Sequence, residues 1–114
     1  MAIDARNPVS TIEAAAPVVT LVNVFTVDPD RQDELVALLE RATDQVMRHQ
    51  PGFVSATIHR ALDGTKVANY AQWESVEAMT AMLSDATARV HMGEALAMAE
   101  AAPALYEVAS VHHA

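Results

Sequence analysis

Apolar and polar positions in the first half of this chain follow two spacings, one typical of a strand and one of a helix. Residues 18–27 form an almost continuous apolar and β-branched run, which predicts a strand covered on both faces. Asp28 and Pro29 follow as an N-cap and a first-turn proline. Apolar residues then recur at steps of three and four, which predicts a helix over residues 29–49. These apolar residues are Leu35, Leu38, Leu39, Ala42 and Val46.

Turn-forming pairs divide the middle of the chain into two further strands. A proline–glycine pair at 51–52 ends the helix, and residues 53–61 have the composition of a second strand. An aspartate–glycine pair at 63–64 is a hairpin-turn signal that leads into a third strand over residues 66–73. The sequence therefore predicts an antiparallel hairpin here.

The last third of the chain predicts a broken helix and a fourth strand. Ser75 can cap the helix, which we expect to break or bend around residues 84–85 and to continue to Ala101. Pro103 then ends it, and residues 105–111 are predicted to form the strand. The order β-α-β-β-α-β predicts an α+β, ferredoxin-like fold, in which both helices pack on one face of a four-stranded antiparallel sheet.

The other face of this sheet is expected to bind a second copy of the chain. Apolar residues occupy strand positions that would face solvent in a monomer, notably along 18–27 and 108–111. An exposed sheet would then carry a large apolar patch. A symmetric homodimer that buries this face is the simplest arrangement.

Composition and charge describe one acidic domain. A chain of 114 residues with 52% hydrophobic residues can bury one core, so we assign residues 18–114 to a single domain. Residues 1–17 lack the features of a signal peptide and are expected to form a flexible arm. A net charge of −8 with only 7 scattered Lys and Arg argues against nucleic acid and anionic membranes, and favours a cytoplasmic protein. The absence of cysteine excludes disulfides and thiolate metal sites, and no apolar run is long enough to cross a bilayer.

The third predicted strand carries the candidate binding chemistry. Side chains alternate along a strand, so Asn69, Ala71 and Trp73 share one face. Ala71 leaves a shallow gap between a carboxamide and an indole N–H, two donors that can hold a ligand oxygen. The structural alternative is that Trp73 packs in the core and Asn69 bonds to backbone.

Several short motifs together resemble one known family. Asn23 in the first strand, the residues 49–53 at the end of the first helix, the turn at 63–64 and the segment 69–75 are similar to those of the antibiotic biosynthesis monooxygenase (ABM) superfamily. The resemblance covers residues 18–111. It implies a dimeric α+β barrel of ferredoxin-like protomers. Small polyketide members of the superfamily oxidise anthrones or related phenols to quinones with O2, without flavin, haem or metal.

The resemblance also implies roles for individual residues. Asn69 and Trp73 match, in order and spacing, an Asn and a Trp that anthrone oxygenases use in catalysis, and Asn23 can orient a second substrate oxygen. These enzymes also use a Tyr and an Arg in the following helical region. Met79 lies close to the Tyr position, whereas Arg89 does not fall clearly on the Arg position. We expect both, with Met82, to contact the substrate.

A histidine near neutral pKa can remove the substrate proton. His91, in the second helical region, is the preferred base, with a surface or structural role as the alternative. His59 can line either the pocket or the dimer interface. His49 suits a helix C-terminus, and His112 and His113 are expected to be solvated.

Two other functions remain open at this stage. Haem-degrading members of the superfamily resemble this chain at Asn23 and approximately at His91, but they require a Trp where this chain has Met82. The other alternative is a dimeric module that binds or cyclises a polyketide without oxidising it. Methionines suit a flat apolar ligand, although at helical spacing they also fill cores. The relevant methionines are Met79, Met82, Met92 and Met98. No histidine or carboxylate spacing predicts a metal site.

Overall fold

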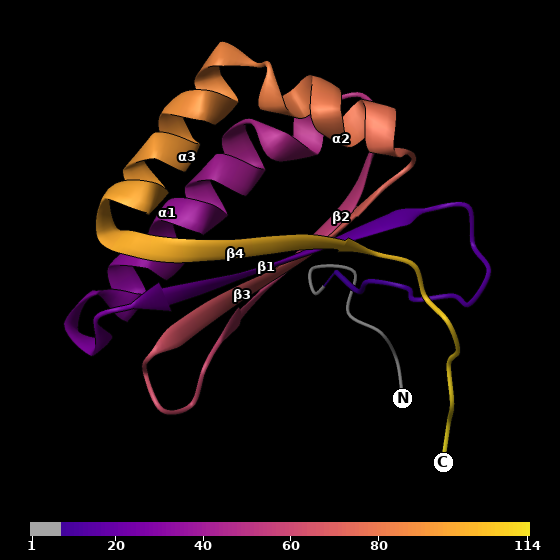
Figure 1. The fold of residues 1–114 in the computed structure, drawn as a ribbon, viewed down its shortest axis with the longest axis horizontal. Helices are drawn as coiled ribbons and strands as arrows, with labels where there is room; N and C mark the ends of the chain where they lie inside the picture. Colours follow the sequence, from indigo (N-terminus) through magenta and orange to yellow (C-terminus); the bar gives the residue numbers. More distant parts are fainter. Residues whose placement is uncertain (1–7) are drawn as a thin grey trace.

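A sheet covered on one face by helices forms the body of the molecule (Figure 1). The computed structural model describes residues 8–114. Within this range the strands lie in the order β2-β3-β1-β4, and each neighbouring pair is antiparallel. The α+β ferredoxin-like prediction is therefore confirmed. The elements are β1 (Val19–Val27), α1 (Gln32–Gln45), β2 (Phe53–Arg60), β3 (Lys66–Trp73), α2 (Val76–Leu83), α3 (Ala86–Met98) and β4 (Ala99–Tyr106), with short 3-10 turns at Pro29–Arg31 and Met47–His49.

Side-chain caps explain where the helical segments begin. The Asp28 carboxylate accepts a hydrogen bond from the Asp30 N–H at 2.9 Å, which starts the turn before α1. Ser75 Oγ accepts from the Ala78 N–H at 3.1 Å at the start of α2. Asp85 caps α3 in the same way. The Asp85 cap lies where the sequence predicted a break, so one predicted helical region becomes the two helices α2 and α3.

The turn between β2 and β3 is held by its own polar groups. Asp63 accepts hydrogen bonds from the Thr65 N–H at 3.0 Å and from the Thr65 hydroxyl at 2.7 Å, and these bonds lower the pKa of the Asp63 carboxyl. Gly64 has φ +83°, a backbone conformation that favours glycine. The sequence signal for a hairpin at this position is confirmed.

The fourth strand is where the sequence prediction was wrong. Strand β4 spans Ala99–Tyr106 and follows α3 directly, whereas the prediction placed helix to Ala101 and strand over 105–111. Alanine-rich residues have little intrinsic preference for strands, but pairing with β1 along this whole segment overrides that preference. Pro103 does not end a helix; it lies in β4 opposite Asn23, and a proline is tolerated there because β4 is an edge strand.

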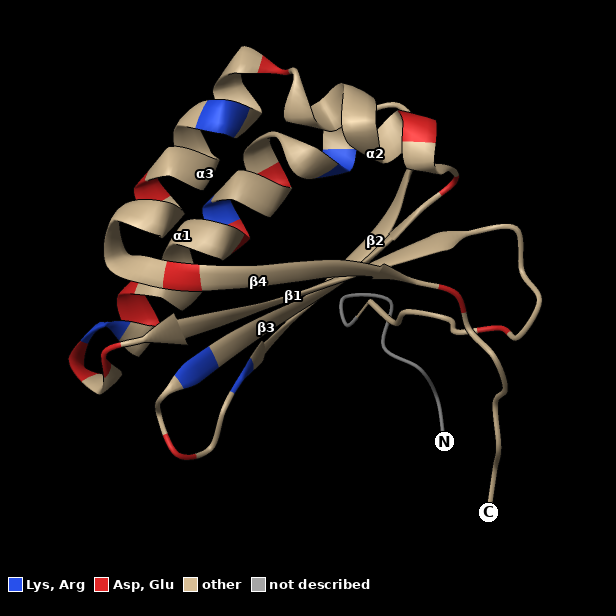
Figure 2. Cartoon of the chain, viewed as in Figure 1, with Lys and Arg blue, Asp and Glu red and all other residues tan. Residues whose placement is uncertain are grey.

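Charged side chains avoid the middle of the sheet. Strand β1 contains none, and the strand charges Arg60, Lys66 and Glu100 lie near one end of the sheet (Figure 2). The segments 8–18 and 107–114 lie on the side of the sheet opposite the helices (Figure 1). Of the predicted arm, residues 1–7 lie outside the described residues, and residues 8–17 contain no helix or strand. No helix in the described range is long and apolar enough to span a bilayer.

Candidate active site

A cavity of about 850 Å³ lies between the sheet and the helices. Its volume is in the range of small-molecule sites. All three helices and all four strands contribute to its wall, and most of the lining side chains are Leu, Met, Ala or Phe. The polar exceptions among the lining residues are Asn23, Thr43, Asn69, Trp73 and His91.

Strand pairing brings two asparagines together on the cavity floor. Asn23 of β1 lies directly opposite Asn69 of β3 in the antiparallel register. Both line the cavity, as does Ala71 two residues further along β3. Small side chains at Ala71 and Ala56, which are paired across β3 and β2, leave the space above the floor open. The sequence prediction that Asn69 and Trp73 share a face is therefore confirmed.

The polar atoms of this floor are buried without internal partners. Asn23 Oδ1, Asn69 Oδ1 and Trp73 Nε1 have no hydrogen-bond partner among residues 8–114, and the same holds for His91 Nδ1. A buried polar atom left unpaired costs about 1–3 kcal/mol, so natural proteins rarely retain several at one place without a use. The side-chain oxygen of Asn69 is thus not bonded to backbone, which was the structural alternative for this residue. The arrangement suits a ligand that supplies oxygen and hydroxyl groups to the floor.

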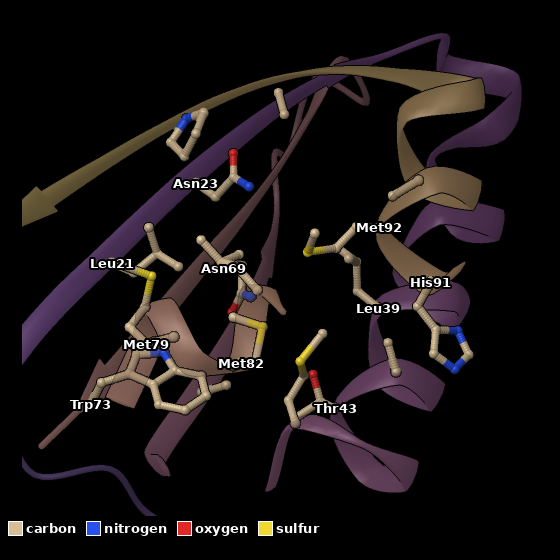
Figure 3. Close-up of a pocket in the computed structure, with 18 of the residues that line it drawn as sticks. Leu21, Asn23, Leu39, Thr43, Asn69, Trp73, Met79, Met82, His91 and Met92 are labelled. Atoms are coloured by element: carbon tan, nitrogen blue, oxygen red, sulfur yellow. The ribbon is translucent and has the colours of Figure 1, made fainter. Parts of the chain in front are cut away.

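Trp73 is held in place by its neighbours at the end of β3. Its side chain is 2% exposed. The Phe53 ring packs edge-on against the indole, with ring centroids 5.4 Å apart and planes at 89°. Gly52, the residue before β2, lets the chain pass close to α2, because a Cβ at this position would lie 2.4 Å from the Ala78 Cβ. Figure 3 shows the indole beside Met79, below Asn69.

Methionines from the helices form the wall that faces the sheet. Met79 and Met82 of α2 are 7% and 5% exposed, and Met92 of α3 is half-buried. All three line the cavity (Figure 3). Flexible thioether side chains adapt to flat apolar ligands, so this wall can close over an aromatic ring system. The position near which the family resemblance places a tyrosine carries the thioether of Met79.

His91 is the one titratable residue among the cavity-lining side chains. It is half-buried on α3. Figure 3 shows its ring on the helix side of the cavity, turned away from Asn23 and Asn69. To reach a substrate held at the asparagines, the imidazole would have to rotate or act through an intervening group.

Two predicted site residues lie elsewhere. His59 is exposed on the opposite face of the sheet, paired with Ala68, and so does not line the cavity. The bulge between Phe53 and Ser55 explains this, because Phe53 lines the cavity before the bulge and Ala56 lines it afterwards. His59 lies three residues beyond Ala56, so strand alternation turns it to the other face. Arg89 is exposed on α3 and is absent from the lining. The expectation that these two residues contact substrate therefore does not agree with their positions.

Sequence reasoning also missed residues that the structure brings to the cavity. Thr43 lies one helical turn after Leu39, and both line the cavity from α1, so helical phase was a usable signal. Pro103 and Leu105 line it from β4. The misplaced strand hid both. Pro103 was assigned to a helix end, which cannot pair with Asn23, and Leu105 was assigned to the start of the strand, so its pairing with Leu21 was not foreseen.

Comparison with known proteins identifies the family. The profile described as Antibiotic biosynthesis monooxygenase matches residues 18–103. The chain belongs to the antibiotic biosynthesis monooxygenase family. It is 41% identical over 99 residues to the tetracenomycin-F1 monooxygenase of Streptomyces glaucescens, an alignment that covers 87% of this chain and 88% of that protein. The resemblance stated from the motifs is confirmed.

Solved structures of other proteins share the fold. A variant of SnoaB, a cofactor-independent oxygenase from Streptomyces nogalater, superposes with a TM-score of 0.75 at 26% identity, covering 84% of this chain and 97% of SnoaB. Rv0793 from Mycobacterium tuberculosis superposes with a TM-score of 0.69 at 18% identity, covering 85% of this chain and 98% of that one. At that identity the second comparison shows a likeness of fold alone.

Proposed function

We propose that this chain is a cofactor-independent monooxygenase that oxidises a polycyclic aromatic polyketide, such as an anthrone, a naphthacenone or a quinol, with O2 to the quinone. The observation that carries the proposal is the set of unpartnered polar atoms on the floor of an otherwise apolar cavity, namely those of Asn23, Asn69 and Trp73. The names of the similar proteins, a tetracenomycin-F1 monooxygenase and a cofactor-independent oxygenase, support the same chemistry.

The proposed reaction draws its electrons from the substrate. Removal of a proton from an anthrone gives an electron-rich anion that can reduce O2 directly. One oxygen atom becomes the new carbonyl of the quinone, and the other leaves as water with the two hydrogens of the reacting carbon. The protein has to stabilise the substrate anion and keep bulk water away.

The cavity floor provides donors for that anion. The Trp73 indole N–H, which is unpartnered, and the Nδ2 amide group of Asn69 can donate to the oxyanion. The unpartnered Oδ1 of Asn23, opposite Asn69, can accept from a substrate hydroxyl and so orient a second substrate oxygen. Donors of this kind act strongly here because the surrounding wall is apolar. His91 is proposed as the base that accepts the substrate proton, in the rotated position described above.

The proposed assembly is a homodimer formed by the sheet faces that the helices leave uncovered. Strand β1 presents Val22 and Val24 on this face, because Asn23 and Phe25 between and beside them line the cavity. Thr20 Oγ1 and Gln72 Nε2, which are paired positions on the same face, are buried without partners among residues 8–114. A second copy can cover the apolar residues of this face. Thr20 and Gln72 are already buried within the protomer, so the proposed contact rests on the valines. We further propose a cytoplasmic location, in keeping with the acidic net charge of −8.

Aerobic incubation with a panel of anthrones, with no cofactor added and with a metal chelator present, tests the proposed reaction. We expect O2 uptake and quinone absorbance in equal amounts, at a rate well above that of the buffer alone. Binding without O2 uptake would favour the alternative, a polyketide-binding or cyclase-like protein. A Soret band after addition of haem, with no anthrone oxidation, would favour the haem-binding alternative.

A further inference from the structure

Exposure is distributed unevenly among the residues that line the cavity. On β3 the lining is closed, since Ala71 and Trp73 are 4% and 2% exposed. By contrast, Leu83, Leu96 and Leu105 also line the cavity but are 41%, 58% and 44% exposed. These three leucines, hereafter the leucine rim, come from the end of α2, from α3 and from β4. Side chains that touch both the cavity and solvent mark where it opens.

The sheet register places Leu105, the strand residue of the leucine rim, relative to the polar floor. Leu105 of the edge strand pairs with Leu21 of β1, which in turn pairs with Ala71 of β3. Two residues further along each strand pair on the same face, Pro103 of β4 pairs with Asn23 of β1, which in turn pairs with Asn69 of β3. Adjacent strands are about 4.8 Å apart, so the β4 edge lies about 10 Å from the strand that carries Asn69. That span is comparable to the long axis of three linearly fused aromatic rings.

We propose that the leucine rim determines substrate specificity by binding the terminal ring of a tricyclic or larger substrate whose reacting end is held at Asn69 and Trp73. The orientation of the ligand rests on the proposed function. Because the rim is made of aliphatic side chains, it favours an apolar terminal ring. A bicyclic ligand held at the same floor is too short to reach it. The chain therefore selects by ring number through residues that do not touch the reacting carbon.

Quenching of Trp73 fluorescence measures this binding without any turnover. Trp73 is the only tryptophan in the sequence and lines the cavity floor, so an aromatic ligand there quenches the whole tryptophan signal. The probes are a dihydroxyanthraquinone, which is tricyclic, and juglone, which is bicyclic. In Leu96→Ser and Leu105→Ser we expect the Kd of the tricyclic probe to rise about tenfold, equivalent to about 1.4 kcal/mol, and that of juglone to stay unchanged.

Two variants outside the cavity serve as matched controls. Leu62 is fully exposed in the turn after β2, and Val90 is 60% exposed on α3 without lining the cavity. Leu62→Ser and Val90→Ser should leave both Kd values unchanged. Equal weakening of both probes in the rim variants, unchanged affinity for the tricyclic probe, or no quenching in the parent protein would each overturn the proposal. Failure of the proposed function is a separate result, seen as selective probe binding without O2 uptake on anthrones.

Discussion

At the scale of single residues, two donors on β3 are expected to carry the rate. Trp73→Phe and Asn69→Ala each remove a hydrogen-bonding group while keeping most of the strand, and loss of one such donor commonly lowers kcat about a hundredfold. Initial rates of O2 uptake, compared with urea unfolding curves of the same variants, measure the two effects separately. We expect the loss of activity to exceed the loss of stability in both variants.

Tyr70→Phe is the matched control for these two variants. Tyr70 lies between them on the same strand, but its side chain faces the small cavity on the opposite side of the sheet, with Thr20 and Tyr106. Removing its hydroxyl should leave the rate near that of the parent. If Trp73→Phe and Asn69→Ala were as active as Tyr70→Phe, both residues would be structural.

His91 is the second residue whose role can be measured. If the imidazole accepts the substrate proton, His91→Ala should lower the rate at neutral pH. A more alkaline medium ionises a phenolic substrate directly and should restore much of the rate. The measurement is a pH–rate profile of both proteins. Superimposable profiles would eliminate His91 as the base, in line with the outward turn of its ring in Figure 3, and would leave deprotonation to the acidity of the substrate.

At the scale of elements, two glycines differ in whether their surroundings leave room for a side chain. Gly52 lies against α2, whereas Gly93 lies in α3 with free space around it. Gly52 has φ +83° and would place a Cβ 2.4 Å from the Ala78 Cβ, whereas a Cβ at Gly93 in α3 would meet nothing within 4 Å. Gly52→Ala should therefore lower the free energy of unfolding by more than about 1 kcal/mol. Gly93→Ala should raise it by up to about 1 kcal/mol, because alanine is the better helix former.

Urea denaturation of the two alanine variants measures this difference directly. Both substitutions add the same methyl group, so any difference between them comes from the local backbone and its neighbours. If Gly52→Ala proved neutral, β2 and α2 would have to be able to separate. The packing of Phe53 on Trp73 would then not depend on this close approach.

At the scale of the whole molecule, the uncovered sheet face is expected to hold two copies together. Val24 lies at the middle of β1 on this face, paired with Ala68 and Ala102. Val24→Asp would bury an unpaired carboxylate at a cost of several kcal/mol, so it should dissociate the dimer or unfold it. Analytical ultracentrifugation gives the mass, and circular dichroism shows whether the chain stays folded.

Val90→Asp is the control for this substitution, since it adds the same charge at a solvent-exposed position of α3. Its mass should equal that of the parent protein. A parent protein that sediments as a monomer at micromolar concentration would contradict the dimer, and so would a Val24→Asp variant that remains dimeric.

Local patterns were enough to predict most elements of this fold. The Asp-Pro and Ser caps, the Asp-Gly turn and the helical spacing of Leu35 and Leu38 act over a few residues, and each is found where it was expected. Strand alternation likewise put Asn69 and Trp73 on one face. Family motifs added the chemistry, and the profile match over residues 18–103 agrees with them.

Contacts between residues far apart in the sequence decided the fourth strand and which side chains reach the cavity. Strand β4 forms because an alanine-rich segment pairs with β1, an interaction between residues about eighty positions apart that no local propensity encodes. The same pairing sets Pro103 against Asn23 and brings Leu105 to the mouth of the cavity. The positions of His59 and Arg89 outside the cavity, and of Thr43 within it, depend on a β-bulge and on the rotation of helices about their axes. Side-chain type can be read along a chain, but the direction in which it points at a site is set by the packing of elements distant in sequence.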